Sequence, residues 1–417
     1  MGALIALTAA VAAQAATNSG SPPPTTPPSD TAAPARKAGS ITYVDLEAGA
    51  GYSTNPELQL NGDGSAYGRI SLRAVHSSVS ARTTTLLSAY AENVTYTNHY
   101  GSNQALSLFG RHEAAVSEKL RVFGDLAADY QQGGQLDTRV LVLPDIPPLV
   151  GQPGGVVILP GGADFLSVTG HEYHFAGHAG AEISLSPRDE LTMSSGVERT
   201  TFHNELTHSS YTSVPVTLAY DRQLSPRTTV GARILLEDTE YNGPARFRTI
   251  TPQVTARVQL SPTLNLSGAV GASFAKIDNG VTTRHSTGIS ANAALCSTTQ
   301  NGSLCGRVTI DEDTATTAGP SKSIGAGIDY TRQLDANSSL SFTVSADHYS
   351  SPVSFVTARN FSSTTYFHAA AEYSRNIGHR LFGGINVAAR KYALDGPDPK
   401  TDFNASLFVR YRFGDVQ

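Results

Sequence analysis

The segment that decides the fold lies near the end of the chain: Asp402-Phe403-Asn404-Ala405-Ser406-Leu407-Phe408-Val409-Arg410-Tyr411-Arg412-Phe413. Side chains of a strand point alternately to opposite faces. One face of this segment would carry Phe403, Ala405, Leu407, Val409, Tyr411 and Phe413, and the other Asp402, Asn404, Ser406, Arg410 and Arg412, with Phe408 as the one apolar intruder. Such a segment fits either a membrane-spanning barrel or the core of a soluble sandwich.

Recurrence of the same alternation favours the membrane. It returns in residues 230–236, 249–260, 264–274 and 340–346. A strand that crosses a bilayer needs roughly 9 to 11 residues. Half of each such strand is polar, which fits a mean hydropathy of only -0.17. We therefore predict an all-β fold, a closed antiparallel transmembrane β-barrel in the cell outer membrane, with a large soluble all-β protein as the alternative.

Composition narrows the function. The chain has 417 residues, 30 of them basic and 35 acidic, which gives a net charge of -5 and no basic field for nucleic acid. After the N-terminus no stretch is long and apolar enough for a spanning helix. Tyr (17) and Phe (15) are abundant and Trp is absent, so an interfacial aromatic girdle would consist of Tyr and Phe.

The N-terminal region predicts export. Residues 1–15 fit a signal peptide, with an apolar core followed by the small-residue cleavage pattern Ala13-Gln14-Ala15. Residues 16–40 are rich in Pro, Ser, Thr and Ala and predict a disordered periplasmic leader that cannot pack a core. We assign residues 41–417 to the barrel.

Turn signals predict about sixteen strands. Seven short turns alternate with eight connections that vary widely in length, including 132–164 and 279–321. Short periplasmic turns and longer outer loops are typical of outer-membrane barrels. An even strand number also returns both ends of the barrel to the periplasmic side.

Two cysteines, Cys296 and Cys305, fall within the connection 279–321. In an exported protein, a pair nine positions apart favours a disulfide over a metal site. We predict a disulfide that staples this loop.

A family resemblance comes from Gly49-Ala50-Gly51-Tyr52-Ser53-Thr54-Asn55-Pro56 at the end of the first strand, and from the final strand with its aromatic-Arg-Phe ending. These features resemble the β-barrel porin 2 family of Gram-negative bacteria over roughly residues 41 to 413. The resemblance implies a channel-like outer-membrane barrel, sometimes associated with surface polysaccharide export. It also implies recognition of a terminal Phe by the barrel assembly machinery, although Gly414 to Gln417 follow Phe413 here.

No motif for covalent chemistry stands out. His171-Glu172-Tyr173-His174, with His178 nearby, is not the zinc-binding H-E-x-x-H motif, because the His after His171-Glu172 lies three positions after His171 instead of four. On a strand, His174 and His178 would share one face while His171 points away. A Gly-x-Ser-x-Gly elbow and a phosphate-binding loop are absent from the sequence. We expect neither metal nor cofactor, and no enzymatic activity.

One connection is unusually apolar. Residues 139–162 include Leu141-Val142-Leu143-Pro144 and Val156-Val157-Ile158-Leu159-Pro160, which water would not favour. Three interpretations remain open. The segment folds into the lumen as a constriction or plug, packs against a partner or a neighbouring protomer, or lies at the outer-leaflet interface.

We predict a porin-like channel with a polar lumen. An accessory barrel for exopolysaccharide export or surface assembly is the alternative, and an outer-membrane hydrolase the third. Expected partners are outer-membrane lipid, the barrel assembly machinery, and a second copy of the chain or a polysaccharide-export protein. The pore-lining candidates are Arg233, Glu237, Arg257, Arg390, Arg410 and Arg412.

Overall fold

The computed structural model describes residues 39–58, 62–132, 140–142, 156–158, 171–203, 210–314, 321–350, 363–394 and 400–415. The predicted signal peptide and nearly all of the predicted leader lie outside these residues. In the described part of the chain, no helix is long and apolar enough to cross a membrane.

Eighteen strands of the described residues form one closed barrel. The first half consists of β1 (Gly39–Ser53), β2 (Ser65–Val79), β3 (Thr83–Tyr96), β4 (Ser102–Ala115), β5 (Leu120–Gln132), β8 (His171–Ser186), β9 (Asp189–Phe202), β10 (Tyr211–Ser225) and β11 (Thr228–Tyr241). The second half consists of β12 (Arg246–Gln259), β13 (Leu264–Asp278), β14 (Thr283–Thr299), β15 (Gly302–Thr314), β16 (Ser321–Asp335), β17 (Ser338–Ser350), β18 (Ser363–Gly378), β19 (Leu381–Leu394) and β20 (Lys400–Gly414).

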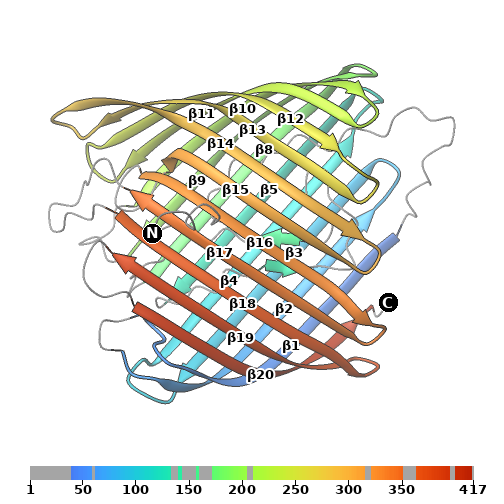
Figure 1. Cartoon of the computed structure of the whole chain (residues 1–417), viewed down its shortest axis with the longest axis vertical. Helices are drawn as coiled ribbons and strands as arrows, with labels where there is room; N and C mark the ends of the chain where they lie inside the picture. Colours follow the sequence, from blue (N-terminus) through green and yellow to red (C-terminus); the bar gives the residue numbers. More distant parts are fainter. Residues whose placement is uncertain are drawn as a thin grey trace, which may run out of the picture.

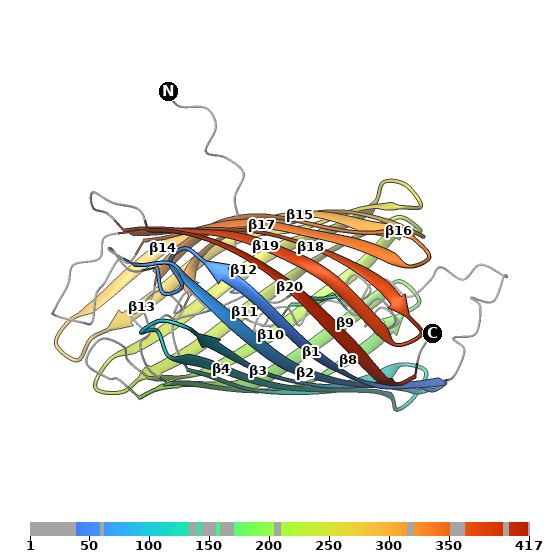
Figure 2. The ribbon, with the colours of Figure 1, turned by 90° about the horizontal axis from the view of Figure 1, so that it is seen from below.

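The topology is a simple meander. Each strand pairs antiparallel with the next barrel strand, β5 pairs with β8, and β20 closes the barrel on β1 from Tyr43↔Gly414 to Ser53↔Asn404. The start of β1 and the end of β20 therefore lie together, at the same end of the barrel as the short turns (Figures 1 and 2). That end is periplasmic by the asymmetry of such barrels. Closure leaves no unpaired edge for lipid to meet.

The predicted closed antiparallel barrel is confirmed, but the predicted number of about sixteen strands is wrong. The missing hairpin is β14 and β15, which occupies most of the connection taken as a loop over 279–321. Its inner face mixes Ser, Thr and Asn with Ala294 and the two cysteines, and its outer face mixes Leu295 and Leu304 with Ala291, Ala293 and Gly306. Small residues on the lipid side weaken the alternation, so this hairpin has little contrast between its faces.

The outer face of the barrel is apolar and exposed. Ile70, Leu126, Val254, Phe403 and Leu407 have 60 to 70% of their surface accessible. A continuous surface of this kind is unfavourable in water but matches the hydrocarbon of a bilayer. The chain is accordingly an outer-membrane barrel. Phe408, the apolar intruder in the final strand, points inward, is 3% exposed and lies under the Arg410 guanidinium at 5.1 Å.

A second, two-stranded sheet pairs β6 (Val140–Val142) with β7 (Val156–Ile158). Both strands come from the apolar segment 139–162, whose other residues lie outside the described part of the chain. Figure 1 shows this small hairpin, a pair of short green arrows, within the outline of the barrel.

Candidate functional site: the inner wall of the barrel

All six predicted pore-lining residues are on the inward face of their strands. Arg410 and Arg412 join β20 to β1 across the seam where the barrel closes. Arg412 donates from Nε to Asp45 Oδ1 at 2.8 Å, and its guanidinium lies 4.1 Å from the centre of the Tyr43 ring. Arg410 donates from Nε to Glu47 Oε2 at 2.9 Å. These two arginines are thus already engaged in holding the seam.

The seam belongs to a longer row of alternating charges. Arg410 on β20 contacts Glu372 on β18 at 3.5 Å and Glu47 on β1 at 2.7 Å. Glu47 also pairs with Arg69 on β2, and Arg69 lies 3.8 Å from Glu92 on β3. Opposite charges at these distances largely cancel one another, so this part of the wall is polar but close to neutral.

Arg390 is inward but buried, with 4% of its surface exposed. Its Nη2 donates to Asp402 Oδ2 at 2.5 Å and to the Pro56 carbonyl oxygen at 3.1 Å. Asp402 is fully buried and also accepts from Ser53 Oγ at 2.7 Å and from the Asn55 backbone N–H at 2.9 Å. The Asn-Pro sequence after β1 is therefore held against β19 and β20 by one buried ion pair. Arg390 serves this clamp rather than contact with solutes.

The other three candidates lie on β11 and β12. Arg233 Nε donates to Gln253 Oε1 at 2.5 Å, and Gln253 in turn donates to Ser290 Oγ at 2.7 Å. Glu237 accepts from Ser213 Oγ at 2.7 Å. Arg257 shares the inward face of β12 with Gln253. This wall is built largely of neutral hydrogen-bonding groups.

Sequence reasoning missed an acidic wall on β5, β8 and β9. Within the described residues of these strands the inward face carries one arginine, Arg121, which lies 3.4 Å from a carboxylate oxygen of Glu182. Near the middle of the wall, His178 lies between Asp125, 2.9 Å from its Nδ1, and Glu198, 3.0 Å from its Nε2. The inward carboxylates of these strands are Asp125, Asp129, Glu172, Glu182, Glu190 and Glu198.

The signal for this wall was present but weak. On β8 the outward positions between Phe175 and Ile183 are Gly177, Ala179 and Ala181, so over this stretch the two faces differ little in hydropathy. On β9, Glu190 and Glu198 alternate with Leu191 and Val197 and could have been found. The histidines lie as expected for a strand: His174 and His178 face inward, and His171 faces outward beside Tyr130.

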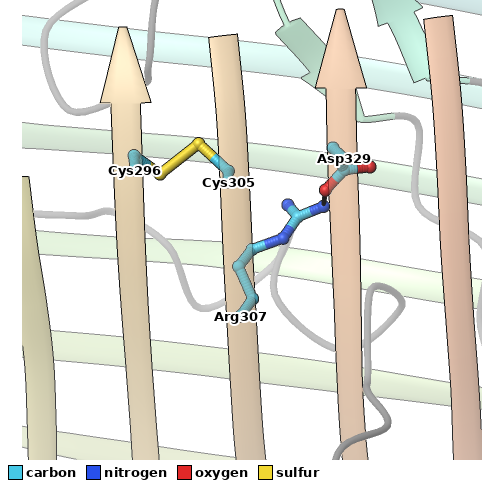
Figure 3. Close-up of a disulfide and its surroundings, with 4 residues drawn as sticks. All are labelled: Cys296, Cys305, Arg307 and Asp329. Atoms are coloured by element: carbon cyan, nitrogen blue, oxygen red, sulfur yellow. Dashed lines mark hydrogen bonds and ion pairs between the residues drawn. A yellow bond between two sulfur atoms is a disulfide. The ribbon is translucent and has the colours of Figure 1, made fainter. Parts of the chain in front are cut away.

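The predicted disulfide partners are also on the inner wall. Cys296 and Cys305 are directly opposite each other on β14 and β15, and the structure joins them by a disulfide (Figure 3). Their predicted position in a loop is wrong, because the hairpin extends past both residues to its turn at Gln300 and Asn301. The next inward pair, Arg307 on β15 and Asp329 on β16, is an ion pair (Figure 3). The covalent link therefore cross-braces two neighbouring barrel strands.

No family model matches the chain, and no curated protein matches it. The resemblance to the β-barrel porin 2 family thus stays a prediction. Among solved structures, the chain is similar to OccK2 (OpdF) of Pseudomonas aeruginosa in complex with glucuronate, with 10% identity and a TM-score of 0.44 over 90% of this chain and 98% of that chain. It is also similar to the FrpB iron transporter of Neisseria meningitidis, with 9% identity and a TM-score of 0.42 over 89% of this chain and 81% of that chain. We carry no solute over from either protein.

Proposed function

We propose that this barrel is a porin-like outer-membrane channel that passes small hydrophilic solutes and favours cations over anions. The observation that carries the proposal is a closed barrel of eighteen strands with an acidic inner wall. Barrels of 16 to 18 strands are wide enough to leave an aqueous channel after side chains have filled part of the interior.

The preference for cations follows from the way the charges are distributed. Around the seam, arginines and carboxylates alternate and cancel. On β5, β8 and β9, carboxylates outnumber the single arginine of the described residues, and one histidine lies between two of the carboxylates. Rings or walls of acidic side chains favour cations in channels, and a low-dielectric wall focuses their field into the pore.

The apolar segment 139–162 belongs to the same proposal. It lies in the connection between β5 and β8, so both of its ends are attached at the acidic wall. We propose that it folds inward and narrows the channel beside that wall. Burial of its Val, Leu and Ile side chains would be favourable, because each Å² of apolar surface removed from water contributes about 25 cal/mol of stabilisation.

The test is the reversal potential of the refolded full chain in a planar bilayer under a KCl gradient. A cation preference is expected. It should weaken in the isosteric triple variant Asp129→Asn, Glu172→Gln, Glu190→Gln, which removes charge without changing size. The control is Asp238→Asn with Glu240→Gln, whose acids face outward beside Arg246. An anion preference, or equal reversal potentials in the triple variant and the control, would refute the selectivity assigned here. Absence of any conductance would favour the export-accessory function.

A further inference from the structure

The outer surface of the barrel has an apolar groove of about 850 Å³ that runs across the strands from β1 to β9. It lies between two neighbouring rows of outward side chains. Toward β9, one row is Leu87, Gly110, Leu126, Gly177 and Val197, and the other is Ala89, Leu108, Ala128, Phe175 and Arg199. Its floor is the backbone of the strand residues between the rows.

Small residues leave room along both rows of the groove. A Cβ atom at Gly110 would lie 3.1 Å from the tip of the Leu87 side chain, and one at Gly177 would lie 3.1 Å from the tip of Leu126. The leucine side chains therefore extend over the glycines, and Ala128 leaves room in the facing row. The result is a long groove on a surface that must be in contact with hydrocarbon.

The groove passes from one leaflet toward the other. Strands of such barrels tilt by about 35 to 45°, so a row perpendicular to the strands also crosses the membrane obliquely. One end lies at Thr42, near the start of β1 on the short-turn side. The other end lies at Arg199, three residues before β9 ends on the long-loop side. That end is at the level of the outer leaflet.

The outer end of the groove is polar and basic. Arg199 is exposed and faces outward, level with Phe175. Above it on the outward face, the rings of Tyr130 and Tyr173 lie 5.1 Å apart, and the Tyr130 hydroxyl is 2.8 Å from His171 Nδ1. A guanidinium, phenols and an imidazole thus gather at the level of lipid headgroups, directly above an apolar hollow.

We propose that this groove binds a phosphorylated lipid of the outer leaflet, with one acyl chain in the hollow beside Gly177 and a phosphate on Arg199. An arginine pairs well with phosphate because its planar donors match the phosphate oxygens. A second barrel packed on the same groove would place Arg199 against apolar side chains of the other copy. Burying a guanidinium in that way is costly without a counter-charge, which a lipid phosphate supplies.

The test uses the full chain extracted from outer membranes and washed in detergent, with bound lipid counted and identified by native mass spectrometry. The groove is filled in Gly110→Val with Gly177→Val, and the cation is removed in Arg199→Gln. Ala293→Val, an exposed outward site on β14, and Arg248→Gln, an outward arginine on β12, are the matched controls. Heat-dependent electrophoretic mobility verifies that every variant is folded.

The wild type and both controls should retain a phosphate-bearing lipid. In each groove variant, the fraction of protein with bound lipid should be roughly tenfold lower than in the wild type. Equal retention in all variants would overturn the proposal. So would a wild type without retained lipid. A dimer that the groove variants convert to monomer would assign the groove to a second copy instead and would equally overturn it.

Discussion

Substitution Asp402→Asn tests the buried clamp that holds the first connection against the seam. Asp402 and Arg390 are 0% and 4% exposed, and Arg390 Nη2 lies 2.5 Å from Asp402 Oδ2. Asparagine keeps the size of the side chain and can still accept the hydrogen bond from Ser53. It removes the negative charge, so the guanidinium of Arg390 stays buried without its counter-ion.

The expected magnitude follows from that burial. Removing one partner of a buried ion pair costs about 3 to 5 kcal/mol, because the remaining charge is desolvated and uncompensated. Replacing both partners costs less, since no charge is left behind. We therefore expect Asp402→Asn with Arg390→Met to be more stable than Asp402→Asn alone, with a coupling free energy of at least about 2 kcal/mol.

The assay is equilibrium unfolding in denaturant of the barrel folded in lipid vesicles. The chain has no Trp, so far-ultraviolet circular dichroism is the suitable signal. Asp238→Asn is the control. Its partners Arg246 and Arg248 are 41% and 50% exposed, so water can solvate their guanidinium groups after the carboxylate is removed. If Asp402→Asn unfolds at the same denaturant concentration as wild type, or if the control lowers the free energy of unfolding by as much, the clamp does not contribute the stability assigned to it.

A second prediction tests the faces of the strands, and a third tests the disulfide. Val254→Arg, on the lipid side, should destabilise the folded barrel in bilayers by about 2 to 4 kcal/mol. Thr255→Arg, on the inward side near Asp221, should fold in normal yield; equal yields for the two variants would contradict the assignment of faces. Cys296 and Cys305 in protein isolated without reductant should resist thiol labelling, and reduction should leave the barrel folded while lowering its stability by at most about 2 to 3 kcal/mol. Rapid labelling of both thiols before reduction would refute the link.

The barrel could be predicted from the sequence because several long strands carry large apolar residues at many outward positions. Val254, Phe403 and Leu407 alternate with polar residues over whole strands, and nothing but a two-faced strand produces that period. The count failed at β14 and β15, where Ala291, Ala293 and Gly306 interrupt the larger outward residues and Ala294 and the cysteines lie inside, so the two faces differ little. Small outward residues are acceptable to lipid but carry no periodic signal.

The inward face was only partly predictable. Alternation places Arg410 and Arg412 inside, but the sequence does not say which carboxylate each arginine meets. Their partners Glu47 and Asp45 lie on β1, more than 360 residues away. The acidic wall depends likewise on β5 and β8 becoming neighbours across a connection of nearly forty residues. Such partnerships follow from barrel closure and register rather than from local pattern.

The central claim is that the polar interior of this barrel is a pathway for solutes, narrowed by the apolar segment. Single-channel recording of the refolded full chain, beside a variant lacking residues 139–162, tests it most directly. We predict discrete channels for both proteins and a larger conductance for the deletion variant. Equal conductances would contradict the constriction, and silent bilayers with both folded proteins would contradict the channel itself.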